Sequence, residues 1–210
     1  MTLAAGDLLD LLDWKRRIFE LYAEVRDTAA AGSPEAAWKR WRLVRDDLFR
    51  THPQSPVPEG ERDAYRGVPL FPYNPAYRST GEVVPTELET LEIGASDGGA
   101  YRFTRFASVR FSLSGRDLSL DAYWLEGYGG GLFLPFRDAT AGHETYGAGR
   151  YLMDTVKGSD LGATPDGRLV LDFNFAYNPS CSYHPRWSCP LAPPANRLDA
   201  EIRAGERSAA

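Results

Sequence analysis

The sequence predicts an α+β protein whose body is predominantly antiparallel β, a barrel or a sandwich, with an N-terminal helical hairpin. Three observations support this fold class. The first 50 residues carry apolar residues at helical spacing, the region from residue 87 onward alternates in short segments between turns, and aromatic residues are abundant. The chain of 210 residues has eleven Tyr, ten Phe and five Trp, and flat rings suit pleated, half-buried surfaces.

The N-terminal segment, residues 1–50, predicts two helices. Apolar residues recur at steps of three and four over residues 6–28, from Leu8 to Val25, which is the period of a helix with one buried stripe. Ser33 and Pro34 indicate an N-cap and a proline at the first position of a second helix. The stripe of this second helix consists of Ala37, Trp41, Val44 and Leu48.

Residues 51–86 predict a proline-rich connection that packs on the β body. Seven prolines interrupt any helical period here, as is typical of a meandering segment. The same stretch contains four aromatic residues, which argue against a free linker because such rings tend to be buried. They are Tyr65, Phe71, Tyr73 and Tyr77.

Residues 87–210 predict an antiparallel β domain that ends in a Cys- and Pro-rich loop. Alternating apolar residues at 103–113 and 118–124 flank a turn at 114–117, which is the pattern of a hairpin with one buried face. Further strands are expected at 131–137, 147–154 and 168–175. Short strands without intervening helices favour a barrel or a sandwich.

Charge and hydropathy limit the classes of partner. The formal charge of −5 argues against nucleic-acid binding, which normally shows a basic patch or stripe. No apolar run approaches the roughly 18 residues needed to cross a membrane. Residues 1–13 lack the basic start and apolar run of a signal peptide. We therefore expect a cytoplasmic protein without a membrane partner, and nothing in the composition indicates a cofactor.

Polar residues gather at one predicted end of the sheet, between residues 137 and 152. On a β-hairpin, Arg137 and Asp138 would end one strand and Glu144 would begin the next. A guanidinium group there matches a carboxylate or phosphate, and an acid can transfer a proton. Alternatively, the arginines pair with Asp138 and Glu144 and lock a turn. The predicted ligand-binding residues of this segment are Arg137, Asp138, Thr140, Tyr146 and Arg150.

A third polar group follows the expected strand at 168–175. Asp172 and Asn174 are two residues apart, so they share one face if the strand continues. Inside a barrel such a pair must bond to each other or to a ligand, whereas on a solvent face it carries no meaning. Asn174, Tyr177 and Asn178 are added to the predicted ligand-binding residues.

Cys181 and Cys189 allow three interpretations. In the cytoplasm they are expected to be buried thiols. As a disulfide they would close a short loop and stabilise it by about 2–3 kcal/mol. With His184 they would give three zinc ligands at an unfamiliar spacing, an incomplete set, so no metal site is assigned.

Distinctive motifs span much of the chain. They are His52–Pro56, Phe136–Thr140, Glu144–Gly147, Gly149–Leu152, Asp172–Asn174, Ala176–Pro179, Cys181, Cys189–Leu191, Pro193–Pro194, Asn196–Leu198 and Ala204–Glu206. Together they resemble the family catalogued as domain of unknown function 1684, over about residues 34–206. The resemblance implies family membership, and the Cys pair belongs to the family pattern, but it supplies no established activity.

The sequence therefore predicts a protein that binds a small ligand at one end of a barrel or sandwich, an anion if the arginines hold it. An enzyme of hydrolase or lyase type would use Glu144 or Asp172 as general base. In a third interpretation the protein is a non-catalytic scaffold or interaction domain, and the same polar groups lock turns. The sequence does not define an oligomeric state.

Overall fold

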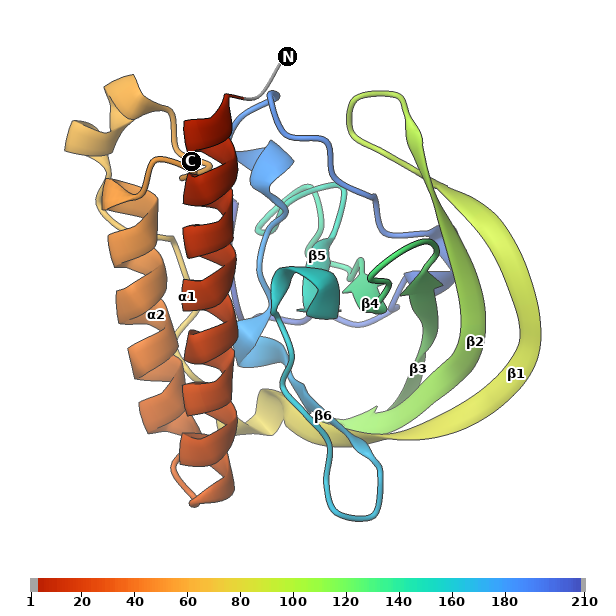
Figure 1. The fold of residues 1–210 in the computed structure, drawn as a ribbon. Coiled ribbons are helices and arrows are strands. Elements are labelled where there is room, and N and C mark those ends of the chain that lie inside the picture. Colours follow the sequence, from red (N-terminus) through yellow and green to blue (C-terminus); the bar gives the residue numbers. More distant parts are fainter. Residues whose placement is uncertain (1–3, 209–210) are drawn as a thin grey trace.

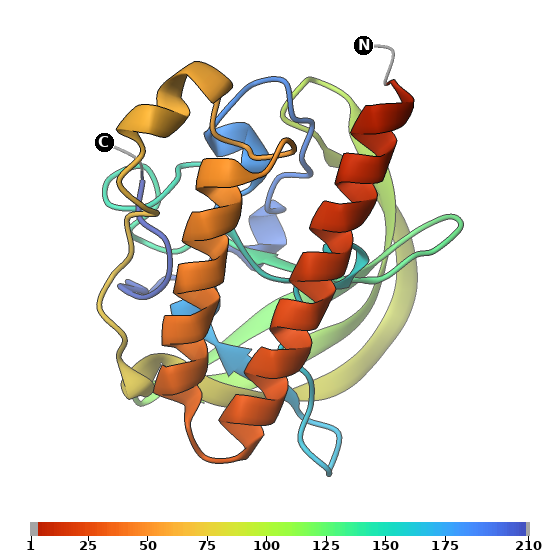
Figure 2. The same ribbon diagram turned by 60° about the vertical axis from the view of Figure 1, so that its left-hand side comes forward.

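Two helices form the N-terminal part of the protein. The computed structural model describes residues 4–208; residues 1–3 and 209–210, the outer ends of the expected helical segment and β domain, lie outside this range. Helices α1 (Ala5–Ala30) and α2 (Pro34–Thr51) form the expected hairpin and lie side by side against the β body (Figures 1 and 2). Pro34 occupies the first turn as predicted, although the Ser33 side chain makes no capping hydrogen bond.

The helices are buried over only part of the expected stripes. In α1 burial begins at Ile18, whereas Leu8 is 53% exposed. In α2, Trp38 is buried in addition to the predicted Trp41, and its indole Nε1 donates to the Asn174 carbonyl at 3.0 Å. The Trp41 indole donates to the Tyr22 hydroxyl at 3.1 Å. These two tryptophans therefore connect α2 to the β body and to α1.

The β body is one antiparallel sheet with the strand order β5-β4-β3-β2-β1-β6. Its strands are β1 (Arg78–Gly94), β2 (Ala100–Leu113), β3 (Arg116–Leu125), β4 (Leu132–Phe136), β5 (Arg150–Asp154) and β6 (Leu169–Asp172). Strong curvature brings the two edges together (Figure 1), and Tyr151 of β5 exchanges two backbone hydrogen bonds with Tyr177, just after β6. The sheet is thus a nearly closed barrel, which confirms the predicted fold class.

The first strand begins earlier than the sequence indicates. Alternation is visible from Glu87, but β1 starts at Arg78 and pairs first with β6 and then with β2. Gly81 makes this crossing possible: a Cβ there would lie 2.3 Å from the Val109 side chain and 2.8 Å from that of Leu171. The register shift between Pro85 and Glu89 accommodates the proline, as bulges do. The prolines therefore concealed the first half of the strand.

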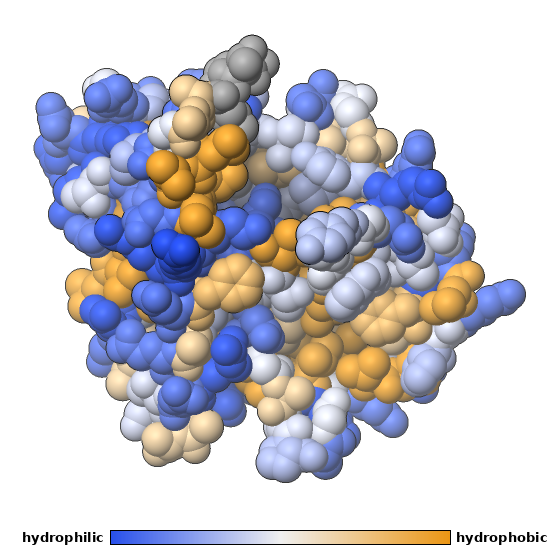
Figure 3. Space-filling view, in the orientation of Figure 1, coloured by the Kyte–Doolittle hydropathy of each residue, from blue (hydrophilic) through white to orange (hydrophobic). Residues whose placement is uncertain are grey.

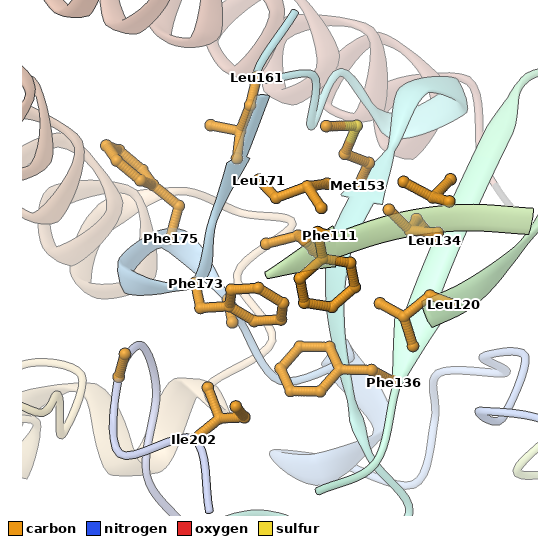
Figure 4. Packing of buried hydrophobic residues seen from close by; sticks show 14 of the residues in the cluster. Phe111, Leu120, Leu134, Phe136, Met153, Leu161, Leu171, Phe173, Phe175 and Ile202 are labelled. Atoms are coloured by element: carbon orange, nitrogen blue, oxygen red, sulfur yellow. The ribbon is translucent and has the colours of Figure 1, made fainter. Parts of the chain in front are cut away.

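The core has three parts, of which the smallest, formed by Phe49, Val57 and Val68, joins α2 to the connection before β1. The largest part lies between the helices and the sheet, where the Phe173 ring contacts the rings of Phe111 and Phe136 at centroid distances of 5.6 and 5.1 Å (Figure 4). A smaller cluster fills the other side of the barrel and consists of Ile93, Phe103, Tyr123, Phe133 and Tyr151. This second cluster forms the wall of the site described below.

The C-terminal segment, residues 189–208, runs along the barrel and joins distant parts of it. It bridges to Ala95 at the β1–β2 turn, to Arg137 after β4, and to Leu70 in the connection before β1. The Phe71 amide donates to the Gly205 carbonyl at 3.0 Å. The segment therefore fixes the connection and the loop after β4 to the same side of the sheet.

Candidate functional site

An apolar cleft opens beside the second core cluster. It has a volume of about 130 Å³, and apolar side chains are visible in the hollow between the helical side and the curved β1–β2 ribbon (Figure 3). Phe103 and Phe133 form its wall, with ring centroids 5.1 Å apart. The full lining is Tyr101, Phe103, Leu125, Phe133, Asp154, Val156, Lys157, Ser188 and Pro190.

A second cavity adjoins the cleft on the side of α1. It measures about 220 Å³ and shares three lining residues, Val156, Lys157 and Ser188, with the cleft. Trp14 and Lys15 of α1 form its other wall. The two spaces thus meet at the short helix η3 (Thr155–Lys157), and both have a lysine amine at their border.

Helix η3 is held in place by a closed turn. Asp154 and Ser159 exchange backbone hydrogen bonds of 2.9 and 3.0 Å around it. Gly158 ends the helix at φ +89°, and a Cβ there would lie only 3.0–3.1 Å from the side chains of Phe19 and Ile18. A glycine at this position therefore lets η3 lie close to α1 and presents Val156 and Lys157 to the cleft.

Asp154 gives the cleft a buried acid. Its side chain is 8% exposed, and the Lys157 Nζ lies 3.9 Å from its Oδ2. Burial raises the pKa of the Asp154 carboxyl, while Lys157 and nearby backbone amides oppose the shift. A carboxyl whose pKa is raised by burial is a candidate for proton transfer, and the half-exposed Lys157 can pair with an anion.

Three of the residues singled out in the sequence, Asp138, Thr140 and Arg150, form a buried network. The Arg150 Nη2 lies 3.2 Å from the Asp138 Oδ1, and both side chains are 1% exposed. Arg150 also donates to the carbonyls of Ala204, Ile202 and Glu206. The Thr140 hydroxyl and the Ile202 amide donate to the Asp138 Oδ2 at 2.7 and 2.8 Å. These polar groups bind the protein's own C-terminal segment.

Glu144, Arg137 and Tyr146 lie apart from one another. Glu144 is on the surface, where its Oε1 accepts a 2.9 Å hydrogen bond from the Arg203 Nε. Arg137 is held by its backbone, which pairs with Asn196 and Leu198. The Tyr146 hydroxyl lies 4.0 Å from the Cys181 sulfur. Of these three predicted residues, Tyr146 therefore faces the cysteine pair.

The strand expected at 168–175 ends at Asp172, so Asp172 and Asn174 do not share a strand face; Asp172 instead caps the short helix η4 (Phe173–Phe175), and through this cap the two side chains bind each other and the connection before β1. The Asp172 Oδ1 accepts from the Asn174 backbone amide and Nδ2 at 3.1 and 2.8 Å. Asn174 in turn exchanges two 2.9 Å hydrogen bonds with the backbone of Asn74. The Arg78 Nε lies 3.6 Å from the Asp172 Oδ2.

This environment predicts a pH effect on stability. Burial raises the pKa of Asp172 to about 6, against the opposing effects of Asn174 and Arg78. The folded state therefore binds a proton that the unfolded state has released, and the free energy of unfolding falls as pH rises from about 4 to about 6. Asp172→Asn cannot titrate, so its stability relative to wild type should rise by about 3 kcal/mol between about pH 3 and pH 7.

Urea unfolding of both proteins across this pH range measures the effect. Subtracting the two curves removes the contribution of the other titrating groups. A stability difference that is the same at every pH would show that Asp172 does not titrate in this window.

Tyr177 and Asn178 border a third cavity of about 50 Å³ between the helices and η3. Arg45 also lines this cavity and belongs to a buried ion pair that the sequence analysis missed, in which the Arg45 Nε lies 2.6 Å from the Glu206 Oε1. The Asn178 amide donates to the Glu206 Oε2 at 2.7 Å. Of the two residues, the sequence analysis includes only Glu206, as the last residue of the motif Ala204–Glu206.

The predicted site residues thus fall into several separate groups, and the apolar cleft is lined by others. Asp154 and Lys157 carried one available signal, because charged residues directly follow the apolar stretch Tyr151–Met153. Within residues 4–208, no group of three or more His, Cys, Asp or Glu could hold a metal ion. No helix in that range is long and apolar enough to cross a membrane.

The fold and the site together define a class: a small, strongly curved antiparallel barrel with a helical hairpin, an apolar cleft and a tied-down C-terminal segment. The family model described as "Protein of unknown function (DUF1684)" matches residues 63–207, and the chain belongs to this family. It is also similar to the solution NMR structure of the uncharacterized protein from gene locus rrnAC0354 of Haloarcula marismortui. Identity is 34% and the TM-score 0.60, covering 86% of this chain and 97% of that one. No curated protein matches the sequence.

Proposed function

We propose that this protein binds a small molecule with a flat apolar part and an anionic group in the cleft beside η3. The observation that carries the proposal is the juxtaposition of an apolar slot, walled by Phe103 and Phe133, with the Lys157 amine at its border. Small-molecule sites are typically apolar concavities with a few polar groups that fix orientation. The proposal keeps the small ligand expected from the sequence, but its binding residues are those that line the cleft in place of the ones predicted from the sequence.

The size and charge of the site support this ligand class. The cleft and the adjoining cavity, about 130 and 220 Å³, together reach the lower end of small-molecule sites, roughly 300 Å³. Lys15 and Lys157 both border the larger space. Two ammonium groups beside an apolar surface favour a carboxylate or phosphate over a cation.

An enzyme is the second candidate function, and the observation that favours it is Asp154. This acid lines the cleft, and burial raises its pKa, which suits a general acid or base. The carboxyls proposed from the sequence lie elsewhere: Glu144 is paired with Arg203, and Asp172 faces Asn174 and Arg78. For chemistry in the cleft, Asp154 is therefore the acid in position. The ion pair of Asp138 with Arg150 then serves structure.

Ligand titrations followed by NMR test the proposed function. Phenylacetate and longer aryl or alkyl carboxylates should shift the amide signals of residues around η3. Phenylacetamide, which has nearly the same shape as phenylacetate but no charge, is the control ligand. Lys157→Gln should weaken carboxylate binding by about tenfold, the effect of losing roughly 1.4 kcal/mol of charge interaction, and leave the amide unaffected. Val156→Trp should abolish binding of both, because Val156 borders both spaces.

Lys39→Gln is the matched control, since Lys39 lies on α2 and pairs with Glu35 on the surface. It should bind like wild type. The proposal fails if no carboxylate in the series binds, or if Val156→Trp binds as well as the unmodified protein.

A further inference from the structure

Two cysteines lie together beside the cavity of about 220 Å³ that adjoins the cleft. Cys181 is in the short helix η5 (Ser180–Ser182), and Cys189 precedes the bridge that Pro190 makes to the β1–β2 turn. Both are thiols in this structure, Cys181 half-buried and Cys189 buried. The two side chains are within hydrogen-bonding range of each other. Residues 181–189 can therefore be joined into one short loop by a small movement of the sulfur atoms.

Polar groups lie around the Cys181 sulfur. The Tyr146 hydroxyl lies 4.0 Å from it. The Ser96 hydroxyl accepts the Cys189 amide and donates to the Trp187 carbonyl, both at 3.1 Å, so it fixes the backbone beside the pair. A donor close to one sulfur favours its thiolate form, which is the nucleophilic form.

The two thiols differ in pKa. The neighbouring Cys189 thiol, with smaller contributions from the nearby Ser96 and Tyr146 hydroxyls, lowers the pKa of Cys181 to about 6. The hydrogen bond with Cys181, together with burial, raises the pKa of Cys189. Near neutral pH, Cys181 is therefore the deprotonated, nucleophilic sulfur, and Cys189 stays protonated.

We propose that Cys181 and Cys189 form a reactive dithiol that hydroperoxides oxidise to an intramolecular disulfide. The Cys181 thiolate attacks the terminal oxygen of the hydroperoxide, the O–O bond breaks, and the alcohol or water leaves with the proton. The resulting Cys181 sulfenic acid reacts with Cys189, forming the S–S bond and releasing one water. The hydroperoxide is reduced by two electrons, and the two thiols are oxidised by the same two. This proposal does not depend on the proposed ligand.

Access favours a small oxidant. Cys189 is buried. Cys181 is half-buried, and the Tyr146 hydroxyl lies 4.0 Å from its sulfur. A hydroperoxide can reach such a sulfur, whereas a protein disulfide needs an exposed one.

The test uses reduced protein treated with an equimolar amount of hydrogen peroxide, then denatured, alkylated and weighed as intact protein. We expect a mass lower by two hydrogen atoms and no alkylation. Cys189→Ser should stop at the sulfenic acid, heavier by one oxygen and trapped by dimedone on residue 181. Cys181→Ser should leave Cys189 reduced and alkylated. Cys189→Ala replaces Cys189→Ser if serine at this buried position prevents folding.

Tyr146→Phe tests the hydroxyl donor directly. It should slow oxidation by at least about tenfold, the effect of losing a hydrogen bond to a charged group, without changing the product. Tyr65→Phe is the control, because its hydroxyl donates to Asp46 at 3.0 Å, away from the cysteine pair and the cleft, and its rate should match wild type. Two alkylated thiols after treatment, or oxidation no faster than that of free cysteine, would overturn the proposal.

Discussion

Arg150→Met is expected to destabilise the protein by about 3–5 kcal/mol, the cost of leaving one partner of a buried ion pair uncompensated. The Arg150 and Asp138 side chains are each 1% exposed, so water cannot replace the lost guanidinium. The carbonyls of Ile202 and Glu206 would also lose donors, at 2.9 and 3.1 Å. Urea unfolding followed by tryptophan fluorescence measures the loss.

Two further variants show how much of the loss in stability comes from the unpaired buried charge. Arg150→Met with Asp138→Asn should recover part of the stability, because asparagine removes the uncompensated charge and keeps an oxygen that can accept from the Ile202 amide. Arg203→Met is the control: this arginine joins Glu144 across the same loop and C-terminal segment, but on the surface, and its replacement should have no measurable effect. Equal losses in Arg150→Met and Arg203→Met would refute the assignment of the buried pair.

The sequence predicted those parts of the fold that depend on local patterns. The helical period of residues 6–28 and the alternation on both sides of Ser114 and Gly115 are interactions between near neighbours, and both elements form as expected. The first half of β1 depends instead on Gly81 fitting against Val109 and Leu171. Such a fit between distant strands leaves no period in the sequence, so the strand was missed.

The site was harder to predict for the same reason. The polar residues between 137 and 152 are unusual in composition, but composition cannot show whether their partner is a ligand or the chain itself. In the structure Arg150 binds carbonyls more than 50 residues away. The strand end before Asp154 and Lys157 could draw attention to these two residues, but the burial of Asp154 and the neighbouring cleft depend on distant parts of the chain and cannot be read from the sequence there. The cysteine pair, by contrast, could be singled out from the sequence, because only cysteine can form a disulfide.

Glu206→Gln is expected to cost about 3–5 kcal/mol and to loosen α2 from the barrel, because it leaves the Arg45 charge buried without its partner. Glu206 is completely buried. Its Oε1 binds the Arg45 Nε at 2.6 Å, and its Oε2 accepts from the Tyr183 hydroxyl at 2.9 Å. The guanidinium of Arg45 also lies over the Phe49 ring, 4.4 Å from its centroid, so it cannot turn to water without disturbing the packing of α2.

Hydrogen exchange of the α2 amides distinguishes this effect from a general loss of stability. Faster exchange in α2 than in β2 and β3 indicates that the helix detaches, because sub-global opening has its own free energy. Arg45→Met with Glu206→Gln should restore part of the loss by removing the unpaired charge. Glu201→Gln, on the exposed part of the same segment, should leave α2 exchange unchanged. If Glu206→Gln exchanges like Glu201→Gln, the ion pair does not hold the helix, and the tryptophan contacts of α2 suffice.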